Sequence, residues 1–354
     1  MKKVILLVMF VPFMVHEIGN IQVITEPFPD SYRAKPGDIV ITEIMADPVP
    51  VVELPPEEYI EIFNRTGNTI DLKNWRLSSA DQNSYFPVVE IGPGDYLILC
   101  YVSDTSVLKP YGRVTGLKPF PALTDRGKVI TLLDDQGTII SGVEYSSDWY
   151  GSTLKSGGGW SLEIIDTDYP FFAEGNWEAS SSRKGGTPGS VNSSTRINPD
   201  RNFAGIINVF PKDSISILIE FSEPVIGFES RINRILFGES GISAAGLSDP
   251  LYRRFIITPE HHLERGRLYT LYLPPDITDF AGNYPSRMSY CFGLPEPPEK
   301  KDLVFNELLF NPLPDNPDYI EFFNLSEKVL DASELFLASV NDQTGIISES
   351  RQVT

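Results

Sequence analysis

Positive charge and long hydrophobic runs are both scarce in this sequence. Its 354 residues include 29 Lys and Arg against 48 Asp and Glu, which gives a formal net charge of −19. Proteins that bind phosphate backbones or anionic lipid surfaces do so through clustered Lys and Arg. The acidic balance therefore argues against nucleic-acid binding and against electrostatic docking on anionic membranes.

Cysteine and histidine are scarce as well. Cys100 and Cys291 each lie inside an apolar run of strand type, and the three histidines stand at positions 16, 261 and 262. We expect two buried free thiols, with an interdomain disulfide as the alternative in an oxidising compartment. The histidines give no zinc-ligand spacing, and no cofactor is expected. Calcium is the alternative, because the acidic residues could bind it.

Motifs of known catalytic folds are missing. The sequence contains no P-loop, no dinucleotide-binding glycine pattern and no HExxH, and its GGGWS stretch is not a nucleophile elbow. Helical periodicity is also nearly absent. The prediction is a protein that is not an enzyme, with no catalytic residue.

The first residues predict export. Two lysines precede a twelve-residue apolar run, Val4 to Val15, which suits a signal-peptide core and is too short to span a bilayer. We expect a signal peptide at 1–20, a polar tail at 21–36, and a mature chain without a membrane span. Its predicted location is secreted or at the cell surface.

The remainder alternates short apolar runs with turn signals, as in antiparallel β-proteins. Val129 to Tyr145 reads as a hairpin whose turn is supplied by Asp135, Gln136 and Gly137. Composition shifts and turn-rich stretches then divide the chain. The expected parts are a domain at 37–192, a domain at 202–293, a proline-rich linker at 294–300 and a partial domain at 301–354.

An internal repeat links the first and last of these parts. Glu43 aligns with Glu307, and the run that begins at Tyr59 aligns with the run that begins at Tyr319. The matching stops after the first third of the module. We expect 301–354 to be the least stable part, and we hypothesise a longer surface protein in which module, spacer and module recur.

Several motifs in order carry a family resemblance. ITEIMADP, EEYIEIFNRTGNTIDLKNWRLS, GPGDYLIL and GGWSLEIID resemble the bacterial lamin tail domain, an immunoglobulin-like sandwich. SISILIEFSEPV, FIITPEHHLERGRLYTLYL and DITDFAGN resemble the bacterial Ig-like domain of S-layer and other surface proteins. Together they resemble secreted multi-domain proteins of Bacteroidota. The fold class that this implies is all-β, with tandem immunoglobulin-like β-sandwiches.

Four polar residues are candidate metal ligands. Glu43 and Glu61 are paired acids in strands, where a structural role competes with calcium binding and with acid-base work. The period of two places Glu43 on one face with Ile41 and Met45. Asp279 and Asn283 lie in a turn, where they either cap backbone groups or hold calcium.

The candidate ligand-binding residues are Trp149 and Tyr150, followed by Gly151 in a loop-like stretch. An exposed aromatic pair would stack on sugar rings, whereas packing in or beside the core is the competing interpretation.

The leading functional prediction is a non-enzymatic scaffold or interaction protein that presents β-sandwich modules outside the cell. Its partners would be other surface proteins or extracellular polysaccharide, and not nucleic acid. One alternative is a carbohydrate-binding accessory protein. Another is an accessory part of a larger secreted hydrolase whose catalytic domain lies outside this sequence.

Overall fold

The computed structural model describes residues 32–79, 82–171, 175–201, 205–237, 241–311 and 317–352. The predicted signal peptide and all but the end of the polar tail lie outside these ranges. Within them the chain is all-β, and the α-helix α1 spans only Thr105–Leu108. None of the described helices has the length and apolar character needed to cross a membrane.

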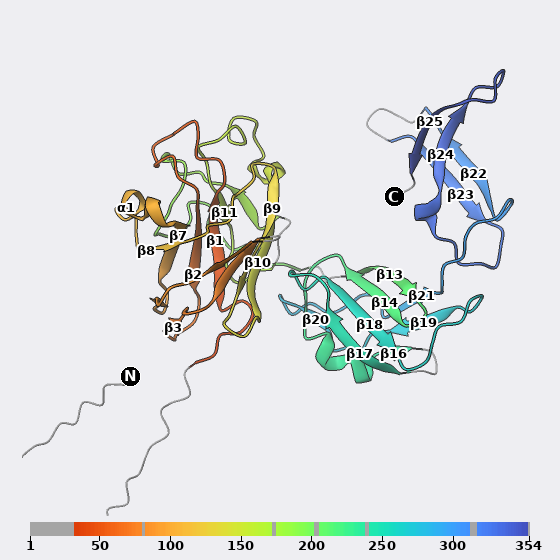
Figure 1. Cartoon of the computed structure of the whole chain (residues 1–354), viewed down its shortest axis with the longest axis horizontal. Helices are drawn as coiled ribbons and strands as arrows, with labels where there is room; N and C mark the ends of the chain where they lie inside the picture. The colour runs from red at the N-terminus through yellow and green to blue at the C-terminus, as the bar shows by residue number, and fades with distance from the viewer. Residues whose placement is uncertain are drawn as a thin grey trace, which may run out of the picture. The chain divides into compact units, whose positions relative to one another are not determined.

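The first module, residues 34–198, is built from two facing sheets (Figure 1). A six-stranded sheet has the order β12-β11-β1-β2-β7-β8, and a four-stranded sheet has the order β10-β9-β4-β5. Its strands are β1 Ile39–Met45, β2 Tyr59–Asn64, β3 Ile70–Asp71, β4 Arg76–Ser79, β5 Gln82–Tyr85, β6 Glu90–Ile91, β7 Tyr96–Tyr101, β8 Val114–Leu117, β9 Gly127–Leu133, β10 Ile139–Ser146, β11 Leu162–Ile164 and β12 Trp177–Ala179. Neighbouring strands run antiparallel except β7 and β8, which the α1 connection makes parallel.

The core of this module lies between the two sheets. Ile60 and Ile62 of β2 point into it with Leu132 of β9, and all three are fully buried. Burial of each such aliphatic side chain contributes about 1.5–3 kcal/mol to the stability of the folded module. The predicted hairpin is confirmed: β9 pairs with β10, and Asp134 Oδ1 accepts N–H bonds from Gln136 and Thr138 across the turn.

The six-stranded sheet is also covered on its outer face. A second apolar cluster gathers there, formed by Met45, Leu54, Tyr59, Ile98, Cys100 and Leu108. The prediction of a buried thiol therefore holds for Cys100. Burial, followed by the nearby Asp104 and Glu57, raises the pKa of this thiol to about 12, so it is un-ionised near neutral pH.

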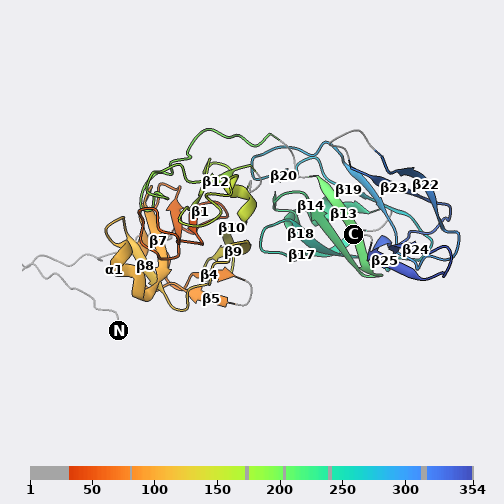
Figure 2. The ribbon, with the colours of Figure 1, turned by 90° about the horizontal axis from the view of Figure 1, so that it is seen from above.

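The second module, residues 205–293, has its own core and its own sheets (Figure 2). The order β13-β14-β18-β17 forms one sheet and β16-β19-β21 another, while β15 pairs with β20. The strands are β13 Ile206–Asp213, β14 Ser216–Phe221, β15 Val225–Ile226, β16 Leu236–Phe237, β17 Ile242–Leu247, β18 Arg254–Pro259, β19 Tyr269–Tyr272, β20 Thr278–Asp279 and β21 Ser289–Phe292. Cys291 of β21 is exposed, and the prediction that it is buried was wrong, because alternation turns Tyr290 and Phe292 inward instead.

The hairpin segment, residues 301–352, repeats part of the first module. Its strands β22 Leu303–Leu309 and β23 Tyr319–Asn324 form one antiparallel pair, and β24 Phe336–Val340 and β25 Ile347–Gln352 form another. Ile320 and Phe322, the counterparts of Ile60 and Ile62, are 38% and 37% exposed. The described part of this segment therefore leaves apolar side chains uncovered.

We predict that limited proteolysis releases the hairpin segment first. Cleavage is expected in the proline-rich linker 294–300, leaving a resistant product that ends near Gly293, because the hairpins bury little apolar surface. Mass spectrometry of the time course identifies the product. Slow amide hydrogen exchange in β22 and β23, equal to that in β1 and β2, would contradict this expectation.

Candidate functional site

A β-bulge decides which face Glu43 occupies. The pairing of β1 with β2 shifts between Ile41 and Glu43, so the side-chain alternation changes phase at Thr42. Ile41 belongs to the inner core, whereas Glu43 lies on the outer face with Met45 and Tyr59. The prediction that Glu43 shares a face with Ile41 was wrong, because a strict period of two does not survive a bulge.

Three glutamates stand in a row across the outer face. Glu43 of β1 pairs directly with Glu61 of β2 on one side and with Glu163 of β11 on the other. All three are fully buried. We call them the carboxylate row. The predicted pair, Glu43 and Glu61, is therefore brought together, while sequence reasoning missed Glu163 although it stands in the recognisable run SLEII.

Residues 181–194, here called the strap, cover the row. The strap supplies a backbone donor to each carboxylate, and its hydroxyl groups donate to Glu163. Thr187 N donates to Glu43 Oε1 at 2.8 Å, Gly189 N donates to Glu61 Oε2, and Ser194 N donates to Glu163 Oε2 at 2.9 Å. The GGTPGSVN sequence, which marks a domain end by composition, is thus the cover of a buried polar layer.

Glycine permits the close approach of the strap. A Cβ on Gly186 would lie 2.6 Å from Glu43 Oε1 and 2.7 Å from the Tyr59 hydroxyl. Gly189 has φ +80°, and a Cβ there would lie 2.1 Å from Tyr111 O. Side chains at these positions would lift the strap from the sheet.

The sheet itself provides further donors. Tyr59 OH donates to Glu43 Oε1 at 2.8 Å and Ser161 Oγ donates to the same atom at 2.6 Å. Thr42, the bulge residue, donates its hydroxyl to Glu61 Oε1 at 3.0 Å. Glu43 Oε2, by contrast, is buried and has no hydrogen-bond partner among the described residues.

Burial and mutual repulsion change the acidity of the row. Desolvation and the neighbouring Glu163 raise the pKa of Glu43 to about 7, although its three donors oppose the shift. Desolvation and Glu43 likewise raise the pKa of Glu61 well above its usual value. These carboxyl groups are closed off from solvent, so a substrate does not reach them. Their arrangement favours a structural role, in which they bond the strap to the sheet.

Hydrogen-bond donors already surround Glu43 and Glu61, where calcium binding was predicted. Donor groups face every oxygen of this pair except Glu43 Oε2. A calcium ion takes six to eight oxygen ligands, and N–H and O–H donors compete for the lone pairs it needs. The geometry favours hydrogen bonding over cation binding for these two residues.

Asp279 and Asn283 do lie together, and two more carboxylates join them. Asp279 Oδ1 accepts the N–H groups of Ala281 and Asn283, as the turn-cap interpretation expects. Single carboxylate oxygens of Asp200, Glu223 and Asp279 lie within 4.8 Å of one another. Desolvation, then Asp200 and Asp279, raise the pKa of Glu223 to about 8. These three acids offer oxygen ligands of the kind calcium prefers.

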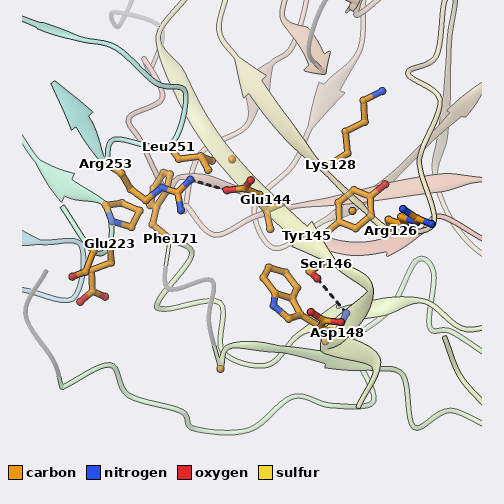
Figure 3. A pocket seen from close by; sticks show the side chains of 17 residues that line it. Arg126, Lys128, Glu144, Tyr145, Ser146, Asp148, Phe171, Glu223, Leu251 and Arg253 are labelled. Atoms are coloured by element: carbon orange, nitrogen blue, oxygen red, sulfur yellow. Dashed lines mark hydrogen bonds and ion pairs between the residues drawn. The ribbon is translucent and has the colours of Figure 1, made fainter. Parts of the chain in front are cut away.

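Trp149 and Tyr150 lie on the 3-10 turn Ser147–Tyr150, which follows β10. Ser146 Oγ caps this turn by accepting the N–H of Asp148 at 3.2 Å (Figure 3). Tyr150 is buried and donates its hydroxyl to Trp160 O, while Trp149 is half-buried and stacks on Trp177 at a centroid distance of 6.0 Å. The rings are thus not the exposed pair that a sugar-stacking site requires.

Comparison with known proteins supports one part of the resemblance. A family model described as Lamin Tail Domain matches residues 33–147, which is less than half of the chain. The matched stretch contains β1 to β10 and ends before β11, β12 and the strap. A search of curated proteins found no match.

We predict that Glu43→Gln flattens the pH dependence of stability. The native pKa of about 7 exceeds the usual 4.5, so the native state binds a proton more tightly than the unfolded state. The free energy of unfolding should fall as pH rises from 4.5 to 7, by about 1.4 kcal/mol per pH unit for this group. The glutamine side chain of the variant would keep an acceptor oxygen and lose the titration.

Denaturant melts from pH 4 to 9 measure this slope. Glu178→Gln is the matched control, because Glu178 lies in the same sheet but pairs with Arg196 at the surface. Identical slopes for the wild type and Glu43→Gln would show that folding leaves the pKa of Glu43 unchanged, which would contradict the prediction.

We predict that calcium stabilises the second module through Asp200, Glu223 and Asp279. Calcium at a hundredfold excess over its dissociation constant would add about 2.7 kcal/mol. It would also suppress the loss of stability that Glu223 causes as pH rises from 4.5 to about 8. Differential scanning calorimetry with calcium and with chelator measures both effects. Glu223→Gln should reduce the stabilisation by calcium, whereas Glu43→Gln should leave it unchanged. A melting curve that chelator does not alter would contradict calcium binding.

Proposed function

We propose that this protein is an exported, non-enzymatic scaffold or interaction protein whose β-sandwich modules bind other surface proteins. The similarity of residues 33–147 to the lamin tail domain supports a β-sandwich interaction module. Export is proposed from the lysine-flanked apolar run at the start of the sequence. Such modules act through edges and loops on a rigid framework.

The observation that carries the proposal is the family match over residues 33–147, which supports a β-sandwich interaction module. Phe305, Leu308, Ile320 and Leu337 line a groove of about 490 Å³ between its two hairpins. Exposed apolar patches mark interaction sites or ligand-binding grooves in folded proteins. By contrast, the carboxylate row of the first module is buried and closed to substrates.

The carbohydrate-binding alternative draws less support. Its candidate aromatic residues are Trp149, which stacks on Trp177, and Tyr150, which is buried. A role as an accessory part of a larger hydrolase remains a proposal that rests on the resemblance to multi-domain secreted proteins.

A binding array tests the proposed function. The purified chain would be applied to immobilised extracellular-matrix proteins and to glycans. We predict protein ligands whose binding falls about tenfold, equivalent to about 1.4 kcal/mol, in Leu308→Ser. Ile197→Ser is the control, because Ile197 is an exposed apolar residue of the first module. Glycan binding that Trp149→Ala abolishes would overturn the proposal in favour of the carbohydrate alternative.

A further inference from the structure

The carboxylate row gathers three acids with no cation to balance them. Glu43 lies directly between Glu61 and Glu163 on neighbouring strands. Among the described residues, no Lys, Arg or His side chain forms an ion pair with the row. The basic residues of the strap, Arg183 and Lys184, are exposed. Ionisation of all three acids would bury adjacent negative charges without a counterion, so the buried row favours a bound proton.

The hydrogen bonds of Glu43 indicate which oxygen holds that proton. Oε1 accepts from three donors, which are Tyr59 OH, Ser161 Oγ and Thr187 N. Oε2 is buried and has no hydrogen-bond donor among the described residues. An ionised carboxylate is an acceptor on both oxygens, whereas a carboxylic acid accepts on one oxygen and carries a hydrogen on the other. The pattern therefore fits a neutral Glu43 with its proton on Oε2.

The strap is the cover that lies directly over this acid. A Cβ on Gly186 would be 2.6 Å from Glu43 Oε1, and Thr187 donates its N–H to the same oxygen. The titratable groups on this outer layer are Tyr59 and Glu61 of β2, Glu163 of β11, Tyr96 and Cys100 of β7, and Tyr111, with Glu57 and Asp104 beside Cys100. All of them are acids, so none supplies a positive charge that would stabilise an ionised Glu43.

The two ends of the strap are held unequally. Asn192, Ser193 and Ser194 donate to the backbone of β1 and β11 and to the third carboxylate of the row. Thr187 and Gly189 each donate one backbone N–H to the first two carboxylates, and Thr187 adds one hydroxyl bond to the third. Residues 186–190 can therefore lift while 192–194 stay in place.

We propose that the strap is a pH-controlled switch, closed while Glu43 holds a proton and open over residues 186–190 once that proton has left. On opening, the bond between Oε2 and hydrogen breaks, its electron pair stays on the carboxylate, and water takes the proton. The ionised Glu43 is then hydrated in place of the strap. This switch is independent of the partners proposed above.

The direction of the pH effect follows from the two states. Burial and the neighbouring Glu163 raise the pKa of Glu43 to about 7 when the strap is closed, and hydration returns it toward the usual 4.5 when the strap is open. The closed state therefore binds the proton more tightly. Its advantage is complete below pH 4.5 and is lost as the pH rises through 7. Between these limits the opening equilibrium should grow about tenfold per pH unit.

Amide hydrogen exchange of the full chain, followed by mass spectrometry from pH 5 to 8, tests the switch. Rates are divided by those of an unstructured peptide of the same sequence, because exchange itself accelerates with pH. Protection of Thr187 and Gly189 should fall about a hundredfold between pH 5 and 7, while β14 and β18 of the second module keep theirs. The strap should also exchange faster than β9 at each pH. Equal rates in the strap and β9 would mean that the strap opens only with the whole module, which would overturn the proposal.

Glu43→Gln removes the proton and keeps the acceptor. Its amide oxygen can replace Oε1, and its NH₂ group can replace the protonated Oε2. Protection of the strap should then be independent of pH between 5 and 7, whereas the control Glu178→Gln should keep the slope of the wild type. A slope that survives in Glu43→Gln, or a wild-type strap whose protection does not change with pH, would overturn the proposal.

A second pair of variants tests the strap as the cover. Gly186→Ala should reduce strap protection at pH 5 at least tenfold and weaken its pH dependence, because the added Cβ meets Glu43 Oε1 and lets water reach the acid. Gly67→Ala is the control, since a Cβ there meets nothing within 4 Å. Strap protection in Gly186→Ala equal to that of the wild type, with the same slope, would contradict the switch.

Discussion

The hydrogen bonds between the strap and the carboxylate row are the constraint on which the first module depends. Three buried carboxyl groups side by side cost a great deal of hydration energy, and only close donors offset it. Thr187, Gly189 and Ser194 supply backbone N–H groups for this purpose. The strap must therefore lie in one register, and the sheet in turn must place its acids beneath it.

The bulge at Thr42 allows β1, which is otherwise apolar, to place Glu43 beneath the strap. Before it, β1 turns Ile39 and Ile41 into the core. After it, Glu43 faces the strap and Met45 lies in the outer apolar cluster. One extra residue thus lets a single strand serve two chemically different faces. The result is a sheet buried on both sides, with an apolar core within and a mixed polar and apolar layer outside.

Much of the fold follows from local pattern. The β9–β10 hairpin is predictable because apolar runs flank turn residues, and the repeat is predictable because whole motifs recur. The site is less predictable, because its parts meet only in three dimensions. No local signal shows that Ser194 will reach Glu163, and nothing near Asp279 in the sequence indicates Asp200. Burial of Tyr150 likewise depends on a distant neighbour, the backbone at Trp160.

Comparing the two copies separates what the hairpin determines from what the strap adds. Glu307 and Glu321 are exposed, yet they accept bonds from Tyr319 and from Asn306, at the positions where Glu43 and Glu61 accept from Tyr59 and Thr42. The hairpin therefore orients both carboxylates even where they are exposed. In the first module the strap adds burial, and the desolvation that follows raises the pKa of Glu43.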